Sequence, residues 1–415
     1  MWKSAVTELP QAKLKAAHAH QVRDGGVAAW SVTAIAFGSA FVAWGAVFYG
    51  HSFYLAALQA RHGWSASLIS TAILGFWIAG IFSTMAVGRV IDRGGPALAL
   101  AWGGLAIGGG VILLGLLRQP WQLFVVYALL GTGYPALATA TISGALARWF
   151  DRRYGLALSL ALSGASVGGA VLPPLMVWLA SRDGFATTTL AIGVGTLAAM
   201  LPLALILHRL GRAAPALPQS PEAGGEASPA TVLHRPAFWI ITLASSLALG
   251  AQVGFLAHQI PLLKDGVGEQ VAALMVSATA LSAMVGRLLI GAAGDRVPLR
   301  LLAACCYLVQ AAGFVVLSLA TGAAALFLGC ILAGLVVGAI VILPPLLLRE
   351  AFGVASYGRT YGYCNVGLFV GAGLGPAATG WLKDWSGDYA LSLWALAAAH
   401  LAAAAVVAWH RQRRA

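Results

Sequence analysis

Long apolar stretches alternate with short polar segments along the whole chain. Each stretch holds about 20 residues or more, the length that a helix needs to cross the hydrocarbon core of a bilayer. The pattern predicts twelve spans, at 30–58, 67–88, 97–117, 121–147, 154–180, 187–208, 237–262, 270–294, 299–319, 323–348, 356–382 and 389–409. We therefore expect an all-α integral membrane protein.

One polar segment is much longer than the others. Residues 209–235 are rich in Pro, Gly, Ala and Ser, a composition typical of a flexible linker. This segment separates six spans from six spans. The regions that we predict are an N-terminal segment 1–29, a six-helix bundle 30–208, the linker 209–236, a second six-helix bundle 237–410 and a tail 411–415.

Lysine and arginine are distributed unequally between the two sides of these spans. With the N-terminus inside, nineteen of the 25 basic residues fall on the inner side and five on the outer, and Arg287 lies within a span. Inner loops of membrane proteins carry such an excess. We expect a multi-pass protein of the plasma (inner) membrane with both termini in the cytoplasm.

Composition narrows the function further. The chain is 60% hydrophobic and 9% charged, whereas a soluble domain carries about 25% charged residues. A net charge of +12 would suit nucleic-acid binding, but the basic residues are spread over short loops. The four cysteines lie in spans, so we predict no disulfide framework and no metal site. Neither a nucleophile–base pair nor paired carboxylates support an enzyme or a cofactor, and residues 1–29 resemble no cleaved signal peptide.

The two halves repeat a short motif at matching positions. A glycine stands four residues before an Asp–Arg pair, after the second span and again after the eighth, in Gly88, Asp92 and Arg93 and in Gly291, Asp295 and Arg296. The glycine would allow close helix contact, the Asp would cap a neighbouring helix and the Arg would pair across the loop. Duplicated halves are typical of transporters, so we expect the motif to control conformational change.

GRVIDRGG after the second span resembles the loop signature of the major facilitator superfamily. Other stretches resemble its monocarboxylate transporter and oxalate–formate antiporter branch, namely Asp24-Gly25-Gly26, the RWFDRRYGLA loop with SGASVGGAVLPPL, the eighth-span sequence GRLLIG, and Gly387-Asp388-Tyr389 followed by Trp394. The resemblance implies two pseudo-symmetric bundles, alternating access and small organic anions as substrates.

Arg287 takes the place of that branch's substrate-binding arginine. The chain departs from the pattern at Ala283, where mammalian-type members carry an Asp, and in span one, which has no Lys. A guanidinium in hydrocarbon costs roughly 3 kcal/mol or more and cannot be deprotonated. It binds a carboxylate through two parallel hydrogen bonds, so we expect Arg287 to hold the substrate. The alternative is a structural arginine bonded to backbone carbonyls.

His51 and His258 lie late in the first and seventh spans. An imidazole donates to carboxylates and titrates near neutral pH, and no acidic residue lies at mid-membrane depth, so both are candidate site residues and candidate proton carriers. Tyr134, Asn365 and Tyr361 offer hydroxyl, amide and ring groups to a bound anion. The alternatives are histidines bonded within a bundle and tyrosines that anchor the membrane interface.

These features predict a secondary active transporter of a small, monocarboxylate-like anion, coupled to protons and working as a monomer. A carboxylate–carboxylate exchanger is the alternative within transport, since embedded carboxylates are absent. A drug–proton efflux pump fits less well because Gly168 is followed by Gly169 and not by Pro. A ligand sensor without transport is disfavoured because no signalling domain is attached.

Overall fold

The computed structural model describes residues 26–212, 232–294, 296–353 and 357–409, which form helices and short connections without strands. The helices are α2 (Val27–Val42), η1 (Ala43–Phe48), α3 (Gly50–His62), α4 (Ala66–Gly94), α5 (Pro96–Gly115), α6 (Pro120–Leu137), α7 (Thr139–Ala147), α8 (Tyr154–Arg212), α10 (Pro236–Val267), α11 (Glu269–Gly294), α12 (Leu299–Leu319), α13 (Ala323–Phe352), α14 (Tyr357–Ser386) and α15 (Ala390–Trp409).

The twelve predicted spans are confirmed. Within the described ranges, ten helices or helix pairs are long and apolar enough to cross a membrane. One of them, α8, holds two spans, because Gly184 interrupts it with φ 80° and ψ 167°. The remaining span is α14, which is less apolar because glycine, tyrosine and asparagine replace larger apolar side chains.

Two spans that the sequence predicts as continuous are interrupted. The first consists of α2, the π-helix η1 and α3. In the fourth, Pro135 precedes a break at Ala138, which has φ −90° and ψ −162°. A proline inside a helix disrupts the hydrogen-bond ladder. At the break, the Ser39 hydroxyl donates to the Leu137 carbonyl at 2.7 Å.

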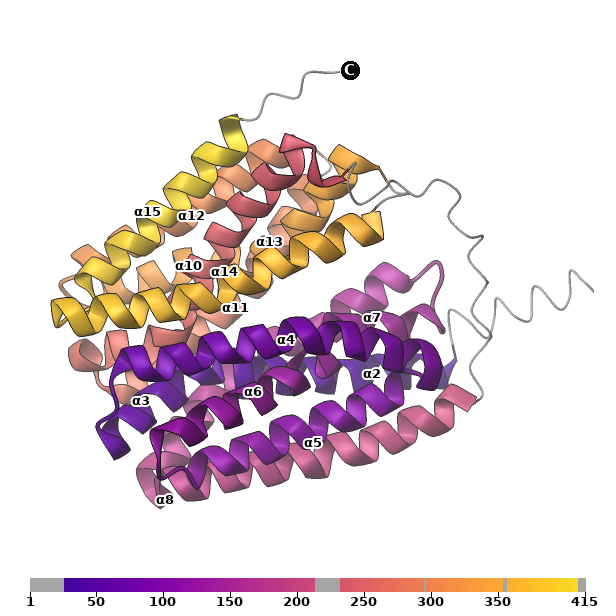
Figure 1. Ribbon diagram of the computed structural model, residues 1–415, viewed down its shortest axis with the longest axis horizontal. Coiled ribbons are helices and arrows are strands. Elements are labelled where there is room, and N and C mark those ends of the chain that lie inside the picture. Colours follow the sequence, from indigo (N-terminus) through magenta and orange to yellow (C-terminus); the bar gives the residue numbers. More distant parts are fainter. Residues whose placement is uncertain (1–25, 213–231, 295, 354–356, 410–415) are drawn as a thin grey trace, which may run out of the picture.

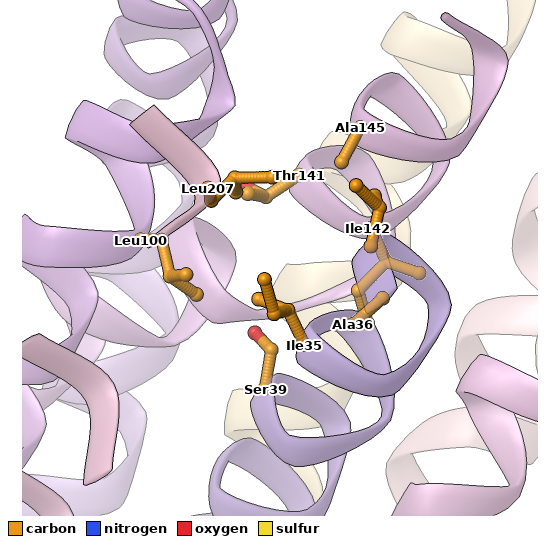
Figure 2. A pocket seen from close by; sticks show the side chains of 9 residues that line it. Ile35, Ala36, Ser39, Leu100, Thr141, Ile142, Ala145 and Leu207 are labelled. Carbon is orange, nitrogen blue, oxygen red and sulfur yellow. The ribbon is translucent and has the colours of Figure 1, made fainter. Parts of the chain in front are cut away.

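A small pocket lies beside this break (Figure 2). It is lined by Ile35, Ala36, Ser39, Leu100, Thr141, Ile142, Ala145 and Leu207, among others, and measures about 10 Å³. That volume accommodates about one water molecule. The pocket is therefore too small for an organic substrate.

The spans form two halves, with α2–α8 below and α10–α15 above in Figure 1. Corresponding helices meet through glycines in both halves. A Cβ at Gly164 or Gly168 of α8 would meet the backbone of α2, and one at Gly371 or Gly375 of α14 would meet the backbone of α10. The fifth span thus packs on the first as the eleventh packs on the seventh, which is the pseudo-symmetry of a duplicated fold.

The halves meet along three helix pairs, α3 with α10, α4 with α14 and α8 with α11. We call the basic end the one where α2 begins and α4 ends; its helix termini carry Arg89, Arg93, Arg148, Arg209, Arg212, Arg235, Arg300 and Arg349. We call the opposite end the one where α3, α10 and α14 end and α4 begins. These two ends orient the description of the site.

Candidate substrate-binding site

Arg287 lies on the face of α11 that contacts the other half. Its guanidinium is partly buried and donates from Nη1 to the Leu162 carbonyl of α8 at 3.2 Å. Ten residues earlier on α11, the Ser277 hydroxyl donates to the Ala170 carbonyl of α8 at 2.6 Å. This carbonyl accepts a hydrogen bond from only one of the five N–H donors that a guanidinium carries.

Glycines on α11 and α13 determine how closely these two helices approach next to Arg287. A Cβ at Gly338 would lie 3.1 Å from the Arg287 Cβ, 3.2 Å from its Nε and 2.8 Å from the Ala283 carbonyl oxygen. One residue before the arginine, a Cβ at Gly286 would collide with the Leu335 backbone. Helices α11 and α13 are therefore in direct backbone contact at this level, and the arginine emerges from a closely packed pair.

Tyr49 lies close to α11, the helix that carries Arg287. It directly follows η1, and π-helical turns are frequent at functional sites. Its ring packs where Gly169 has no side chain, next to Ala280 of α11. Sequence analysis missed Tyr49; the aromatic-rich segment Trp44–Tyr54 was the signal that pointed to it.

Tyr134 lies in an aromatic cluster in the first half. Its ring centroid is 5.7 Å from Trp44, 6.4 Å from Phe48, 5.5 Å from Phe76 and 5.8 Å from Trp77. The Phe48 ring also contacts the Tyr49 ring at 5.5 Å. Tyr134 is thus connected to Tyr49 through the ring of Phe48.

Tyr361 and Asn365 lie on the face of α14 that contacts α4. Residues four apart share one face of a helix, and Phe369, one turn after Asn365, contacts the Trp77 ring at 5.2 Å. One turn further, a Cβ at Gly373 would lie 2.6 Å from Leu74 of α4. Both predicted residues are partly buried, which places them beside the aromatic cluster towards the basic end.

His51 does not lie with Arg287. It is fully buried inside the first half, 4.9 Å from the Phe76 ring and 5.6 Å from the Tyr127 ring. Both ring nitrogens lack a partner among the described residues. Its position on α3 directs the side chain between α4 and α6, so the structure gives no contact of His51 with the arginine.

His258 lies where the two halves touch near the opposite end. It is fully buried, and its Nε2 is 2.9 Å from the Ser70 hydroxyl oxygen of α4 and 3.1 Å from the Pro376 carbonyl oxygen of α14. Its Nδ1 is 3.1 Å from the Tyr389 hydroxyl oxygen. A histidine bonded within the helices is the alternative interpretation of the sequence, and these contacts have that form.

The repeated motif lies at the basic end. Gly88, Asp92 and Arg93 are in the last two turns of α4, Gly291 is in the last turn of α11, Arg296 follows it, and Asp295 lies outside the described residues. Among the described residues, no heavy atom lies within 4 Å of a Cβ placed at Gly88. The role of the motif in conformational change stays a prediction.

The charge balance around Arg287 favours an anion. Among the described residues, no carboxylate lies within ion-pair distance of it. A half-buried guanidinium whose N–H donors are only partly satisfied can hold a carboxylate through charged hydrogen bonds.

Comparisons with known proteins bear on the family and the fold of this chain. The family profile of the Major Facilitator Superfamily matches residues 29–268 and 259–415. Monocarboxylate transporter 11 of Homo sapiens is 30% identical over 393 residues, covering 89% of this chain and 80% of that protein. Monocarboxylate transporter 13 of Bos taurus is 29% identical over 336 residues, covering 76% and 75%.

Solved transporter structures share the fold. A mutant of the nucleoside transporter NupG superposes with a TM-score of 0.74 at 15% identity, covering 92% of this chain and 100% of that one. A mutant of the peptide transporter POT in complex with alafosfalin gives 0.72 at 16% identity, covering 94% and 96%. These neighbours show that the chain shares their helical fold.

Proposed function

Because this chain belongs to the Major Facilitator Superfamily, we propose that it is a secondary active transporter of a small, monocarboxylate-like organic anion. The observation that carries the proposal is Arg287, a partly buried guanidinium between the halves that donates to one backbone carbonyl and has no carboxylate within ion-pair distance among the described residues. A permanent charge at this depth requires compensation. A bound carboxylate supplies it through two parallel hydrogen bonds.

The groups around Arg287 suit a small anion with an apolar part. Tyr49 and Tyr134 offer hydroxyls, while the partly buried Trp44 and Phe369 offer ring surface. Tyr361 and Asn365 add polar groups from the second half. The similarity to two monocarboxylate transporters supports the same substrate class.

Transport would proceed by alternating access between the halves. Contacts across the α4–α14 pair extend from Phe369 against Gly80 to Asp384 against Ser67, so the opposite end is closed in this conformation. We infer that Arg287 is reached from the basic end, which the excess of arginines places in the cytoplasm. The repeated Asp–Arg motif at this end would close it in the other state, and one chain in the plasma membrane would suffice.

We propose proton coupling for net transport, with carboxylate exchange as the second candidate. Exchange is supported because no carboxylate lies near Arg287 among the described residues. Many proton symporters use such an acidic side chain to carry the proton. Counterflow in liposomes separates the two: uptake that requires internal anion supports exchange, whereas uptake driven by a pH gradient alone supports symport.

The test of the site is the substitution Arg287→Ala. Loss of a charged hydrogen-bonding group costs about 1.5–3 kcal/mol, which is roughly 10- to 100-fold in affinity. Uptake of labelled acetate, lactate, pyruvate and butyrate into proteoliposomes should fall accordingly while the protein inserts and elutes normally. Arg287→Lys keeps the charge without the planar fork and should be intermediate.

The control is Arg118→Ala, which removes an exposed loop arginine and should leave uptake unchanged. Uptake by Arg287→Ala equal to that of the unmodified protein would refute the assignment of the site.

A further inference from the structure

The contact between the halves at the opposite end is built around His258. This histidine belongs to α10, yet it reaches Ser70 on α4 of the other half at 2.9 Å. Two neighbouring contacts cross the same boundary: Ile260 N–H donates to the Ser52 hydroxyl at 2.6 Å, and the Asp384 carboxylate accepts from Ser67 N–H at 2.7 Å. We call this group of three contacts the seal.

The partners of His258 define its protonation state in the seal. The Pro376 carbonyl can only accept, so Nε2 carries a hydrogen and shares it between this oxygen at 3.1 Å and Ser70. Nδ1 then accepts from the Tyr389 hydroxyl at 3.1 Å. A neutral imidazole therefore has a suitable partner at both ring nitrogens. In the imidazolium, Nδ1 also carries a hydrogen and would need an acceptor at the place where the Tyr389 hydroxyl now donates.

A water-accessible cavity lies directly outside the seal. It measures about 450 Å³, and its lining includes Gln59, Lys264, Asp265, Lys383, Asp388 and Tyr389. We call this cavity the vestibule. Tyr389 lines the vestibule and also contacts His258. Water in the vestibule can donate a proton to the Tyr389 oxygen while the proton already on this hydroxyl moves to His258 Nδ1. The phenol has one proton before and after the transfer.

The charged groups near His258 come from several elements. Asp384 of α14 acts on it electrostatically, and Asp265 of α10 acts on Tyr389. Lys264 and Lys383 line the vestibule, while α4 contributes the neutral Ser70 and α3 carries Arg61 over the Phe185 ring. Asp384 is the group that would stabilise an imidazolium, but its oxygens accept from Ala66 and Ser67 N–H.

We propose that His258 is a proton-binding site filled from the vestibule and that its protonation opens the seal. The proposal rests on the alternating access proposed above. A positive charge on the fully buried His258 raises the free energy of the closed state. Separation of the halves lets water solvate this charge, so the proton binds more tightly to the open state. The Asp384 carboxylate accepts from N–H groups at the N-terminus of α4 and stabilises the closed contact there.

The test needs no substrate. Spin labels at Ala60 of α3 and Trp385 of α14, both exposed, report the distance across the seal in lipid nanodiscs by double electron–electron resonance. Cys305, the exposed cysteine among the four, is first changed to Ser. Between about pH 8 and about pH 5, where histidine titrates, the population at longer distance should rise several-fold.

His258→Gln supplies one donor and one acceptor but cannot gain a charge, so its distance distribution should not change with pH. Asp384→Asn should raise the longer-distance population at all pH values and retain the pH step. A pH step in His258→Gln as large as in the unmodified protein, or no step in the unmodified protein, overturns the proposal.

Arg287→Ala separates this proposal from the transport function. It should lose uptake and keep the pH step, because the seal does not include the arginine. Normal uptake by Arg287→Ala would refute the substrate site and leave the seal standing, whereas a pH step independent of His258 would refute the proton site and leave the substrate site standing.

Discussion

At the residue scale, the proposed site is centred on Arg287, with Tyr49 next to the same helix. The arginine donates to one carbonyl, and the phenol ring packs between Gly169 of α8 and Ala280 of α11. The Tyr49 ring is fixed against Gly169, so its hydroxyl is held in position independently of any ligand. A preorganised hydroxyl beside a guanidinium lowers the cost of binding an anion.

Tyr49→Phe should therefore weaken anion binding without disturbing the fold. Removing one hydrogen bond costs about 0.5–1.5 kcal/mol, or roughly 2- to 13-fold in the apparent affinity measured by concentration-dependent uptake. The matched control is Tyr127→Phe, since the Tyr127 hydroxyl is buried without a partner among the described residues. It should leave uptake unchanged, and equal effects of the two substitutions would contradict a role for the Tyr49 hydroxyl.

At the element scale, close contact between α11 and α13 determines where Arg287 points. Gly286 and Gly338 make this contact possible because neither carries a side chain. Helices in lipid gain stability mainly from such packing, since no hydrophobic effect drives them together. The position of the guanidinium thus depends on residues that never touch the substrate.

Gly338→Ala should displace Arg287 and reduce uptake several-fold. The new methyl group would lie 2.8 Å from the Ala283 carbonyl oxygen, which belongs to the backbone and cannot rotate away. Overpacking of this kind typically costs about 1–3 kcal/mol, so thermal unfolding should also shift downwards.

Gly75→Ala on α4 is the control, because no heavy atom lies within 4 Å of its Cβ position. Alanine is the better helix former, so stability should be equal or slightly higher. If uptake is unchanged with alanine at either position, the α11–α13 contact adjusts without moving the arginine and the prediction is wrong.

At the scale of the whole molecule, the seal and the glycines along the α4–α14 pair hold one conformation. A Cβ at Gly380 of α14 would lie 2.7 Å from the Ser70 hydroxyl oxygen and 2.8 Å from the Ala66 carbonyl oxygen. The halves can approach at the opposite end only while this position lacks a side chain.

Gly380→Val should hold the seal open even at about pH 8. The distance between labels at Ala60 and Trp385 should then show mainly the longer population, with no further change on acidification. Gly362→Val on the same helix is the control, because its Cβ position has no neighbour within 4 Å and its distance distribution should match that of the unmodified protein. A closed distribution in Gly380→Val would show that the seal does not depend on this approach.

The sequence predicted the spans well and the site in part. The spans begin within about three residues of the predicted positions, because helix starts follow local signals such as Pro96, Pro120 and Pro236 at first helical positions. Arg287 could be found because a charge in an apolar stretch is conspicuous. Tyr49 could not, since its role depends on a π-helical turn and on Gly169, 120 residues later in the chain.

By itself, the sequence determined the twelve membrane-crossing segments and the one embedded arginine, because the bilayer imposes length and polarity on each segment separately. Only the tertiary structure decided which side chains share a site. It placed His51 inside the first half, His258 in the seal with Ser70, and Tyr49 between Gly169 of α8 and Ala280 of α11. These positions follow from contacts between helices far apart in the chain, and the order of residues within a span carries no record of them.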